Sequence, residues 1–250
     1  APRDGLQTLA RSFSVAERAE LIARLVAAGL TRIEVGSFVN PARVPQMAGL
    51  EELLAVADKP AGLRFAGLAM NRRGVERACD TDLDEVRIVL VATETFSRRN
   101  QGAGPEDTLA MIAATAPDLR AAGKRVTVVI AAAFGCPFEG AVATADVTAL
   151  AARAVAAGAE EVVFADTIGC GVPVQVAALA DWARAQAVPF GFHLHDTRGT
   201  GLANAWAAVQ GGARVLDAAA GGLVGSPFTP GATGNIATED HVWMLRTSGL

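Results

Sequence analysis

Two of the three histidines in the chain, His193 and His195, stand two residues apart in an apolar run and are followed directly by Asp196. Residues two apart on a β-strand point to the same side of a sheet, so this spacing places both imidazoles together. One divalent cation satisfies both neutral rings, whereas two hydrogen-bonded histidines in a packed core are the alternative for an isolated pair. The pair therefore indicates either a metal site or a packed strand.

The elements around this pair alternate between short apolar runs and alanine-rich helical patterns. Seven runs have the composition of buried parallel strands, at residues 31–38, 64–69, 85–92, 125–133, 160–167, 189–196 and 215–222. Eight segments have helical patterns, at residues 14–28, 45–57, 71–78, 105–121, 144–157, 173–186, 201–211 and from 237 to the end. This alternation predicts an α/β fold, namely a TIM (β/α)₈ barrel whose first strand is truncated.

An open, doubly wound sheet is the alternative arrangement of the same elements. Against it, no GxGxxG motif follows an early strand, and the chain has no GxxxxGK[ST] phosphate loop. No linker or low-complexity segment divides the chain, so we expect one domain over residues 1–250. If the first strand is absent from the molecule, two sheet edges stay unpaired, and a longer chain that supplies it should melt at a higher temperature.

The expected strand ends are polar, and reactive groups in a TIM barrel stand at the C-terminal ends of its strands. These positions hold Arg3 and Asp4 where strand one would end, Glu34, Thr93 with Glu94, Asp166 with Thr167, and His193, His195 and Asp196. Carboxylates that converge on the histidines favour the metal site over a packed pair. Asp4 would complete a ligand face, and Asn235, in the loop after strand eight, would add a carbonyl oxygen.

The composition favours small-molecule chemistry. Hydrophobic residues make up 51% of the 250 residues, and the formal net charge is −4, with acids and bases interspersed. This charge pattern argues against nucleic-acid and membrane partners. Cys79, Cys136 and Cys170 are odd in number and form no CxxC motif, and no apolar run is long enough to cross a bilayer, so we expect reduced thiols and a cytoplasmic location.

Six motifs in order carry a resemblance that runs nearly end to end. They are PRDGLQ at 2–7, IEVGSFVNPARVPQMA at 33–48, GCPFEG at 135–140, ADTIGCGVP at 165–173, HLHDTRGTGLAN at 193–204 and GATGNIATED at 231–240. Together they resemble the 3-hydroxy-3-methylglutaryl-CoA lyase family of the DRE-TIM metallolyases. The resemblance implies Mg²⁺ or Mn²⁺ bound through Asp4, His193, His195 and Asn235. It also implies retro-Claisen cleavage of a 3-hydroxyacyl-CoA into acetyl-CoA and a keto acid, and a possible homo-oligomer.

The same resemblance implies roles for further residues. Arg3 would stabilise the enolate oxygen, or else serve only as a surface cation paired with Asp4, and either Asp166 or His193 would move the hydroxyl proton. Substrate-binding positions near the mouth are Gln7, Glu34, Ser37, Asn71 and Thr167, with Glu34 favoured as a group that orients Arg3. Asp196 and Thr197 are expected to orient the imidazoles, and His241 to be exposed on a helix.

The chain departs from the family pattern at one place. The family's loop after strand eight reads GGCP and its cysteine moves a proton, whereas this chain has Ser226 there. A hydroxyl, with a pKa nearer that of water at about 15.7, releases a proton far less readily than a thiol at about 8.5. Three interpretations follow from Ser226. Another group protonates the enolate, the substrate is a related 3-hydroxyacyl-CoA such as citramalyl-CoA, or the activity is much reduced. A 4-hydroxy-2-oxo acid aldolase and a silent acyl-CoA-binding barrel are the remaining alternatives.

Overall fold

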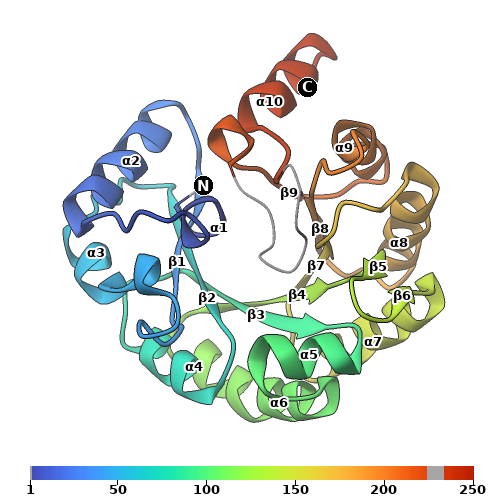
Figure 1. Ribbon diagram of the computed structural model, residues 1–250, viewed down its shortest axis with the longest axis horizontal. Coiled ribbons are helices and arrows are strands. Elements are labelled where there is room, and N and C mark those ends of the chain that lie inside the picture. Colours follow the sequence, from blue (N-terminus) through green and yellow to red (C-terminus); the bar gives the residue numbers. More distant parts are fainter. Residues whose placement is uncertain (1, 224–233) are drawn as a thin grey trace.

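One curled parallel sheet forms the centre of the molecule, in the strand order β1-β2-β3-β4-β7-β8-β9 (Figure 1). The computed structural model describes residues 2–223 and 234–250. The strands of the sheet are β1 (Arg32–Ser37), β2 (Arg64–Ala69), β3 (Glu85–Val91), β4 (Arg125–Ala131), β7 (Glu161–Asp166), β8 (Phe190–Leu194) and β9 (Val215–Asp217). Within the described residues these are the seven predicted strands, and the predicted TIM-barrel fold is confirmed.

Most of the helices pack around the outside of this sheet, whereas α1 lies inside the ring that they form (Figure 1). They are α1 (Asp4–Gln7), α2 (Val15–Ala27), α3 (Leu50–Val56), α4 (Arg72–Cys79), α5 (Glu94–Gln101), α6 (Pro105–Ala121), α7 (Thr144–Ala156), α8 (Pro173–Ala185), α9 (Gly201–Gln210) and α10 (Thr238–Thr247), with two short 3₁₀ turns, η1 (Pro45–Met47) and η2 (Ala220–Gly222). Across the described segments, no helix combines the length and the apolar character that crossing a bilayer requires.

The strands are buried because both of their faces are covered. Every residue of β3 and β7 is buried, and the outward side chains pack under the helices in one large apolar cluster. Local signals fix the helix starts: Ser14 and Glu17 form a capping box at the start of α2, which satisfies backbone N–H groups that the first turn leaves free. The apolar pattern therefore sets the barrel, and the caps set where its helices begin.

The structure corrects several expected boundaries. The expected helix 45–57 is divided into η1 and α3 at Gly49, whose φ of 68° is left-handed. Helix α5 and the small hairpin of β5 (Gly135–Cys136) and β6 (Gly140–Ala141) were not predicted. The polar segment expected to end a first strand instead forms the short helix α1, which begins at Asp4.

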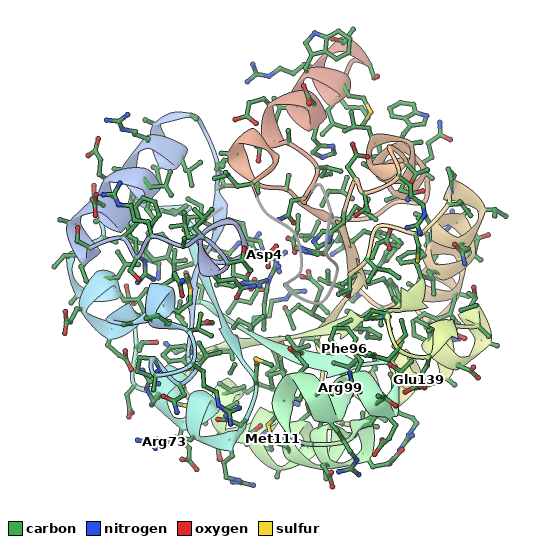
Figure 2. The ribbon with its side chains drawn as sticks, viewed as in Figure 1. Asp4, Arg73, Phe96, Arg99, Met111 and Glu139 are labelled. Atoms are coloured by element: carbon green, nitrogen blue, oxygen red, sulfur yellow. The ribbon has the colours of Figure 1, made fainter. Side chains whose placement is uncertain are left out.

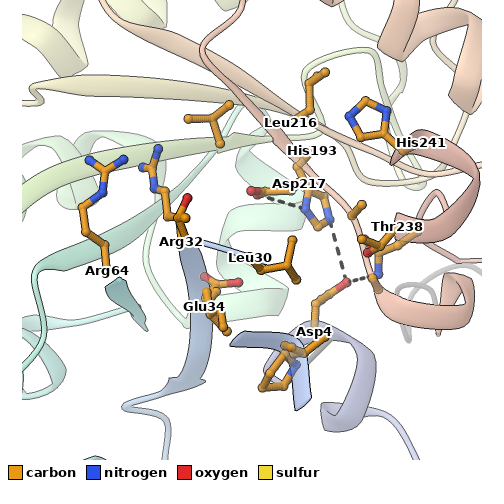
Figure 3. A pocket seen from close by; sticks show the side chains of 18 of the residues that line it. Asp4, Leu30, Arg32, Glu34, Arg64, His193, Leu216, Asp217, Thr238 and His241 are labelled. Atoms are coloured by element: carbon orange, nitrogen blue, oxygen red, sulfur yellow. Dashed lines mark hydrogen bonds and ion pairs between the residues drawn. The ribbon is translucent and has the colours of Figure 1, made fainter. Parts of the chain in front are cut away.

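The two edge strands, β1 and β9, flank a cavity of about 480 Å³. In the described part of the chain these strands do not pair with each other. The cavity extends from Asp4 and His193, near the C-terminal ends of the strands, to Arg32 and Arg64 at the start of the strands, as Figure 3 shows. Predicted site residues therefore border a space that reaches the barrel interior.

A glycine sets the close approach of β8 to β9. A Cβ at Gly191 would lie 2.6 Å from the backbone oxygen of Val215. We expect Gly191→Ala to lower the free energy of unfolding by about 1–3 kcal/mol, because a backbone atom cannot move aside as a side chain can. Gly36→Ala in β1 is the matched control, since its nearest neighbours are side-chain atoms of Leu50 and Arg18. Thermal melts should rank Gly191→Ala below it, and the reverse order would contradict the prediction.

Candidate active site

Asp4, His193 and His195 meet in the barrel interior. Nε2 of His193 lies 3.1 Å from Nε2 of His195, and these two nitrogens lie 3.8 Å and 3.9 Å from Oδ2 of Asp4. One ligand-type atom of each residue lies within 4.8 Å of the others. Figure 2 shows Asp4 turned to the centre of the barrel, whereas Arg73 points outward at the rim. Residues almost two hundred positions apart thus converge as predicted.

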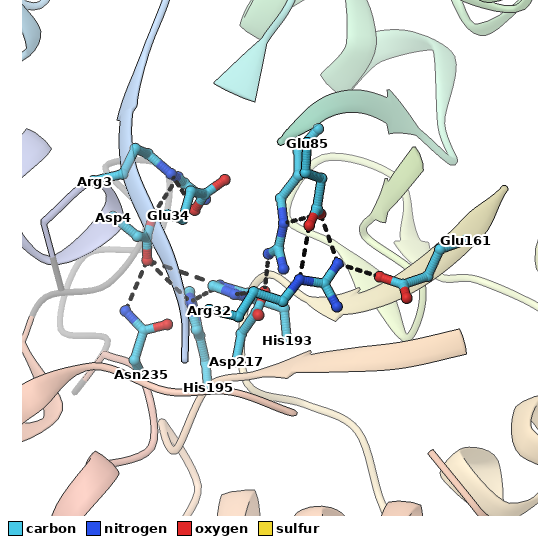
Figure 4. Close-up of polar contacts among 11 residues, drawn as sticks. Arg3, Asp4, Arg32, Glu34, Glu85, Glu161, His193, His195, Asp217 and Asn235 are labelled. Atoms are coloured by element: carbon cyan, nitrogen blue, oxygen red, sulfur yellow. Dashed lines mark hydrogen bonds and ion pairs between the residues drawn. The ribbon is translucent and has the colours of Figure 1, made fainter. Parts of the chain in front are cut away.

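Neighbouring side chains hold the carboxylate of Asp4 in place. Its Oδ1 accepts hydrogen bonds from Arg3 Nη1 at 2.7 Å and Gln7 Nε2 at 2.9 Å. Arg3 also donates from Nε to Glu34 Oε2 at 2.8 Å, which is the orienting contact expected for Glu34 (Figure 4). Arg3 is only 9% exposed, so it is a buried group of the site and the surface-cation alternative is wrong.

Asn235 reaches the same carboxylate from the segment after β9. Its Nδ2 donates to Asp4 Oδ2 at 2.7 Å and to the backbone oxygen of Leu223 at 3.0 Å, and its backbone forms a bridge with that of His195. The amide nitrogen therefore faces Asp4 here, whereas the predicted ligand atom is the carbonyl oxygen. Rotation of the amide group exchanges the two atoms, so the ligand role of Asn235 stays a prediction.

Charge and burial set the protonation of the three central groups. Burial raises the pKa of Asp4, but the charge of Arg3 and the two imidazoles outweigh it and lower this pKa to about 2. Burial, together with His193, lowers the pKa of His195 to about 4. Burial also lowers the pKa of His193, but the hydrogen bond and charge of Asp217 and the charge of Asp4 raise it overall. At neutral pH, Asp4 is therefore an anion, and His195 is a neutral imidazole that has a lone pair available for a metal ion.

This donor set fits a divalent cation. Two donor atoms about 2.1 Å from one ion and at right angles lie about 3.0 Å apart, close to the 3.1 Å between the two imidazole nitrogens. A carboxylate with two imidazoles suits several divalent metals, and the protein supplies the required negative charge through Asp4. Asp4, His193 and His195 would hold the ion.

The affinity for such a cation should depend on pH through His193. The pKa of His193 is raised above 6.5, and its proton must leave before Nε2 can bind a metal. We therefore expect Mn²⁺ affinity to rise about tenfold per pH unit below this pKa and to level off above it. His195 adds no slope in this range, because its pKa is about 4. Calorimetric titration with Mn²⁺ across neutral pH tests this, and a flat profile would contradict it.

Three other predicted substrate-binding residues, Ser37, Asn71 and Thr167, either have no side-chain hydrogen bond among the described residues or accept one from a backbone N–H group. Ser37, at the end of β1, is buried, and within residues 2–223 and 234–250 its Oγ has no hydrogen-bond partner. Asn71 caps α4 by accepting from Gly74 N, and Thr167 Oγ1 accepts from Ala132 N. Their predicted contacts with substrate remain untested.

The buried carboxylate of Asp166 ends β7 and holds the loop that follows. Its two oxygens accept from the backbone N–H groups of Cys170 and Gly171, each at 2.9 Å. Burial raises its pKa, although those N–H groups act in the opposite direction. Both oxygens are thus engaged by the loop, and the predicted catalytic role of Asp166 remains a prediction.

Two supporting expectations differ from the structure. Asp196 accepts from the backbone N–H of Gly201 at the start of α9 and, among the described residues, makes no hydrogen bond or ion pair with an imidazole, so it holds a helix start instead. His241 on α10 is only 6% exposed, whereas we expected its side chain to be exposed. Ser226 lies outside the described residues.

Sequence reasoning missed two residues next to His193. Asp217 on β9 lies 3.4 Å from His193 Nδ1 (Figures 3 and 4). Arg87 on β3 donates to the same Asp217 oxygen at 2.5 Å. An acid inside the apolar run 215–222 and an arginine inside 85–92 were the available signals. Neither stands out without knowledge of the barrel interior.

A parallel β/α barrel with a carboxylate and two imidazoles at the C-terminal ends of its strands is typical of a metal-dependent TIM-barrel enzyme. The chain belongs to the HMGL-like family, whose model matches residues 1–250, and it is a carbon–carbon lyase.

Similar proteins extend along the whole chain. It is 45% identical over 262 residues to (R)-citramalyl-CoA lyase of Chloroflexus aurantiacus, covering 100% of this chain and 83% of that one. It is 40% identical over 253 residues to hydroxymethylglutaryl-CoA lyase of Pseudomonas mevalonii, covering 99% and 83%. The structure of an HMG-CoA lyase from Acinetobacter baumannii in complex with coenzyme A and 3-methylmalate superimposes with a TM-score of 0.94 at 36% identity, covering 99% and 82%.

Proposed function

We propose that the chain cleaves a branched 3-hydroxyacyl-CoA by a retro-Claisen reaction that depends on Mg²⁺ or Mn²⁺ and releases acetyl-CoA and a keto acid. The meeting of Asp4, His193 and His195 at one point carries the proposal. Relatives named for cleavage of citramalyl-CoA and hydroxymethylglutaryl-CoA support the substrate class. Three free cysteines in the described residues are compatible with the cytoplasmic location expected from the sequence.

The residues of the site divide the chemistry between them. A divalent cation, when bound, supplies Lewis-acid polarisation of the substrate's hydroxyl and carboxylate. Arg3 stabilises the thioester oxygen as it becomes an enolate oxygen, because its guanidinium is permanently charged and already oriented by Glu34 and Asp4. Across the described residues, Arg3 Nη2 makes no hydrogen bond, which leaves a donor for that oxygen.

Proton movements complete the reaction at two points. The substrate hydroxyl loses its proton to Asp166 or His193, both of which stay candidates for the base. Engagement of both Asp166 oxygens by the loop argues against Asp166, and engagement of His193 Nε2 by a cation argues against His193. The enolate carbon then takes a proton from Ser226 or from another donor.

Citramalyl-CoA and hydroxymethylglutaryl-CoA are the two substrates to compare first. The relative named for citramalyl-CoA is 45% identical and the one named for hydroxymethylglutaryl-CoA is 40% identical, which favours citramalyl-CoA slightly. Both substrates carry a tertiary hydroxyl and a carboxylate that one cation can chelate. The proposal therefore names the class of substrate, and product analysis must identify which acyl-CoA is cleaved.

Product analysis tests the proposal directly. The protein, stripped with chelator and reloaded with Mg²⁺ or Mn²⁺, is incubated with both acyl-CoAs and with 4-hydroxy-2-oxo acids, and the fragments are identified by mass. We expect acetyl-CoA with a keto acid from at least one acyl-CoA. Cleavage of the oxo acids alone would indicate the aldolase. Binding of metal and acyl-CoA without cleavage, also in Ser226→Cys, would indicate a silent barrel.

A further inference from the structure

Asp217 and His193 lie side by side on the adjacent strands β9 and β8. The register of β8 and β9 pairs His193 with Asp217. Paired residues on adjacent parallel strands point to the same side of a sheet, so both side chains enter the barrel interior. Figure 3 shows Asp217 on one side of the imidazole and Asp4 on the other.

The two ring nitrogens of His193 serve different neighbours. Nδ1 lies 3.4 Å from Asp217 Oδ2, whereas Nε2 faces Asp4 and His195. A neutral imidazole carries its proton on one nitrogen and a lone pair on the other, and only the lone pair binds a cation. A carboxylate that accepts a hydrogen bond from Nδ1–H therefore directs the lone pair of Nε2 toward the candidate metal position.

Arg87 holds Asp217 from the opposite side of the barrel. Its Nη1 donates to Asp217 Oδ2 at 2.5 Å and its Nε donates to Glu85 Oε1 at 2.9 Å, while the side chain is 3% exposed. The side chain of Asp217 is half-buried, with 19% exposed, and a carboxylate withdrawn from water in this way is stabilised as an anion by a paired cation, which this arginine supplies. The guanidinium thus keeps Asp217 ionised and able to accept from His193.

Glu161 is a buried acid of the barrel interior that forms ion pairs with arginines but makes none with His193. Glu161 on β7 pairs with Arg32 and Arg125 and is 2% exposed. Its ion pairs among the described residues include no histidine. Loss of Glu161 therefore reproduces the loss of a buried charge without the loss of a contact to His193.

We propose that Asp217, held by Arg87, is a positioning residue that fixes the Nδ1–H tautomer and the orientation of His193 for binding the divalent cation. The proposal rests on the proposed function for the presence of that cation. It adds an Asp217–His193–cation relay, the arrangement in which an outer carboxylate makes an imidazole a better and better-oriented ligand.

Nitrogen NMR and metal titration test the proposal without substrate. With ¹⁵N-labelled histidine only three residues give ring signals, since the chain has three histidines. In the metal-free wild type, at a pH above the raised pKa of His193, we expect His193 as the Nδ1–H tautomer. Asp217→Ala should give a mixture of tautomers at His193 and an Mg²⁺ affinity about 10–100-fold lower, whereas Glu161→Ala should change neither.

The outcomes separate this proposal from the proposed function. If Asp217→Ala keeps the wild-type tautomer and Mg²⁺ affinity, or if Glu161→Ala loses as much affinity, the positioning role is overturned while the function can stand. If the wild type binds neither Mg²⁺ nor Mn²⁺, both proposals fail. Should Asp217→Ala not fold because Arg87 loses one of its two carboxylate partners, Arg87→Met/Asp217→Ala removes both charges, and it should fold yet still bind Mg²⁺ weakly.

Discussion

His195→Ala is expected to bind Mn²⁺ at least about 100-fold more weakly than the wild type and to show no detectable cleavage, because changes to groups outside the ligand set already cost 10–100-fold. This ring is buried, lies 3.1 Å from His193 Nε2 and has a pKa lowered to about 4 by burial and by His193, so it is neutral at working pH. Calorimetric titration with Mn²⁺ and turnover of the substrate found by product analysis measure both effects.

His241→Ala is the matched control for this variant. His241 is also a buried histidine, but it lies on α10 and is not part of the cluster of Asp4, His193 and His195. Its removal should lower the melting temperature and leave the Mn²⁺ affinity unchanged. Equal loss of Mn²⁺ binding in both variants would show that cavity formation, rather than loss of a ligand, causes the effect.

Arg3→Lys should lower kcat, measured with metal at saturation, by about 10²–10³, since removal of one donor to a developing oxyanion has an effect of this size. The guanidinium donates to Glu34 and Asp4 at the same time, and a single ammonium group cannot reproduce this fork. A lysine keeps the positive charge, so the variant separates orientation from charge. Steady-state kinetics with metal at saturation measure kcat and KM separately.

Arg18→Lys provides the corresponding control. Arg18 is buried as well, but its guanidinium donates to the backbone oxygens of Ala48 and Val35 outside the cluster. This variant should melt at a lower temperature with kcat unchanged. If Arg3→Lys kept the wild-type kcat, Arg3 would have no role at the enolate oxygen.

The sequence was sufficient for the barrel because its strands are apolar on both faces. Runs such as β3 and β7, buried throughout, are characteristic of a parallel sheet covered by helices. Short elements were missed for a physical reason. The hairpin of β5 and β6 has two residues in each strand, and α5 has a polar sequence that shows no apolar period.

The site was partly predictable for a related reason. The pair His193 and His195 has a strand spacing that points both rings inward, and the quoted motifs brought Asp4 and Asn235 to the same place. Asp217 was not found because a single acid in an apolar run has many interpretations until the strand register is known. His241 was misassigned because a histidine on a terminal helix is buried or exposed according to packing that the sequence does not reveal.

Anomalous diffraction from crystals soaked in Mn²⁺ tests the central claim most directly. The claim predicts one strong peak about 2.0–2.3 Å from Asp4 Oδ2, His193 Nε2 and His195 Nε2. A peak at another place on the molecule, or none at a Mn²⁺ concentration that supports turnover, would contradict it.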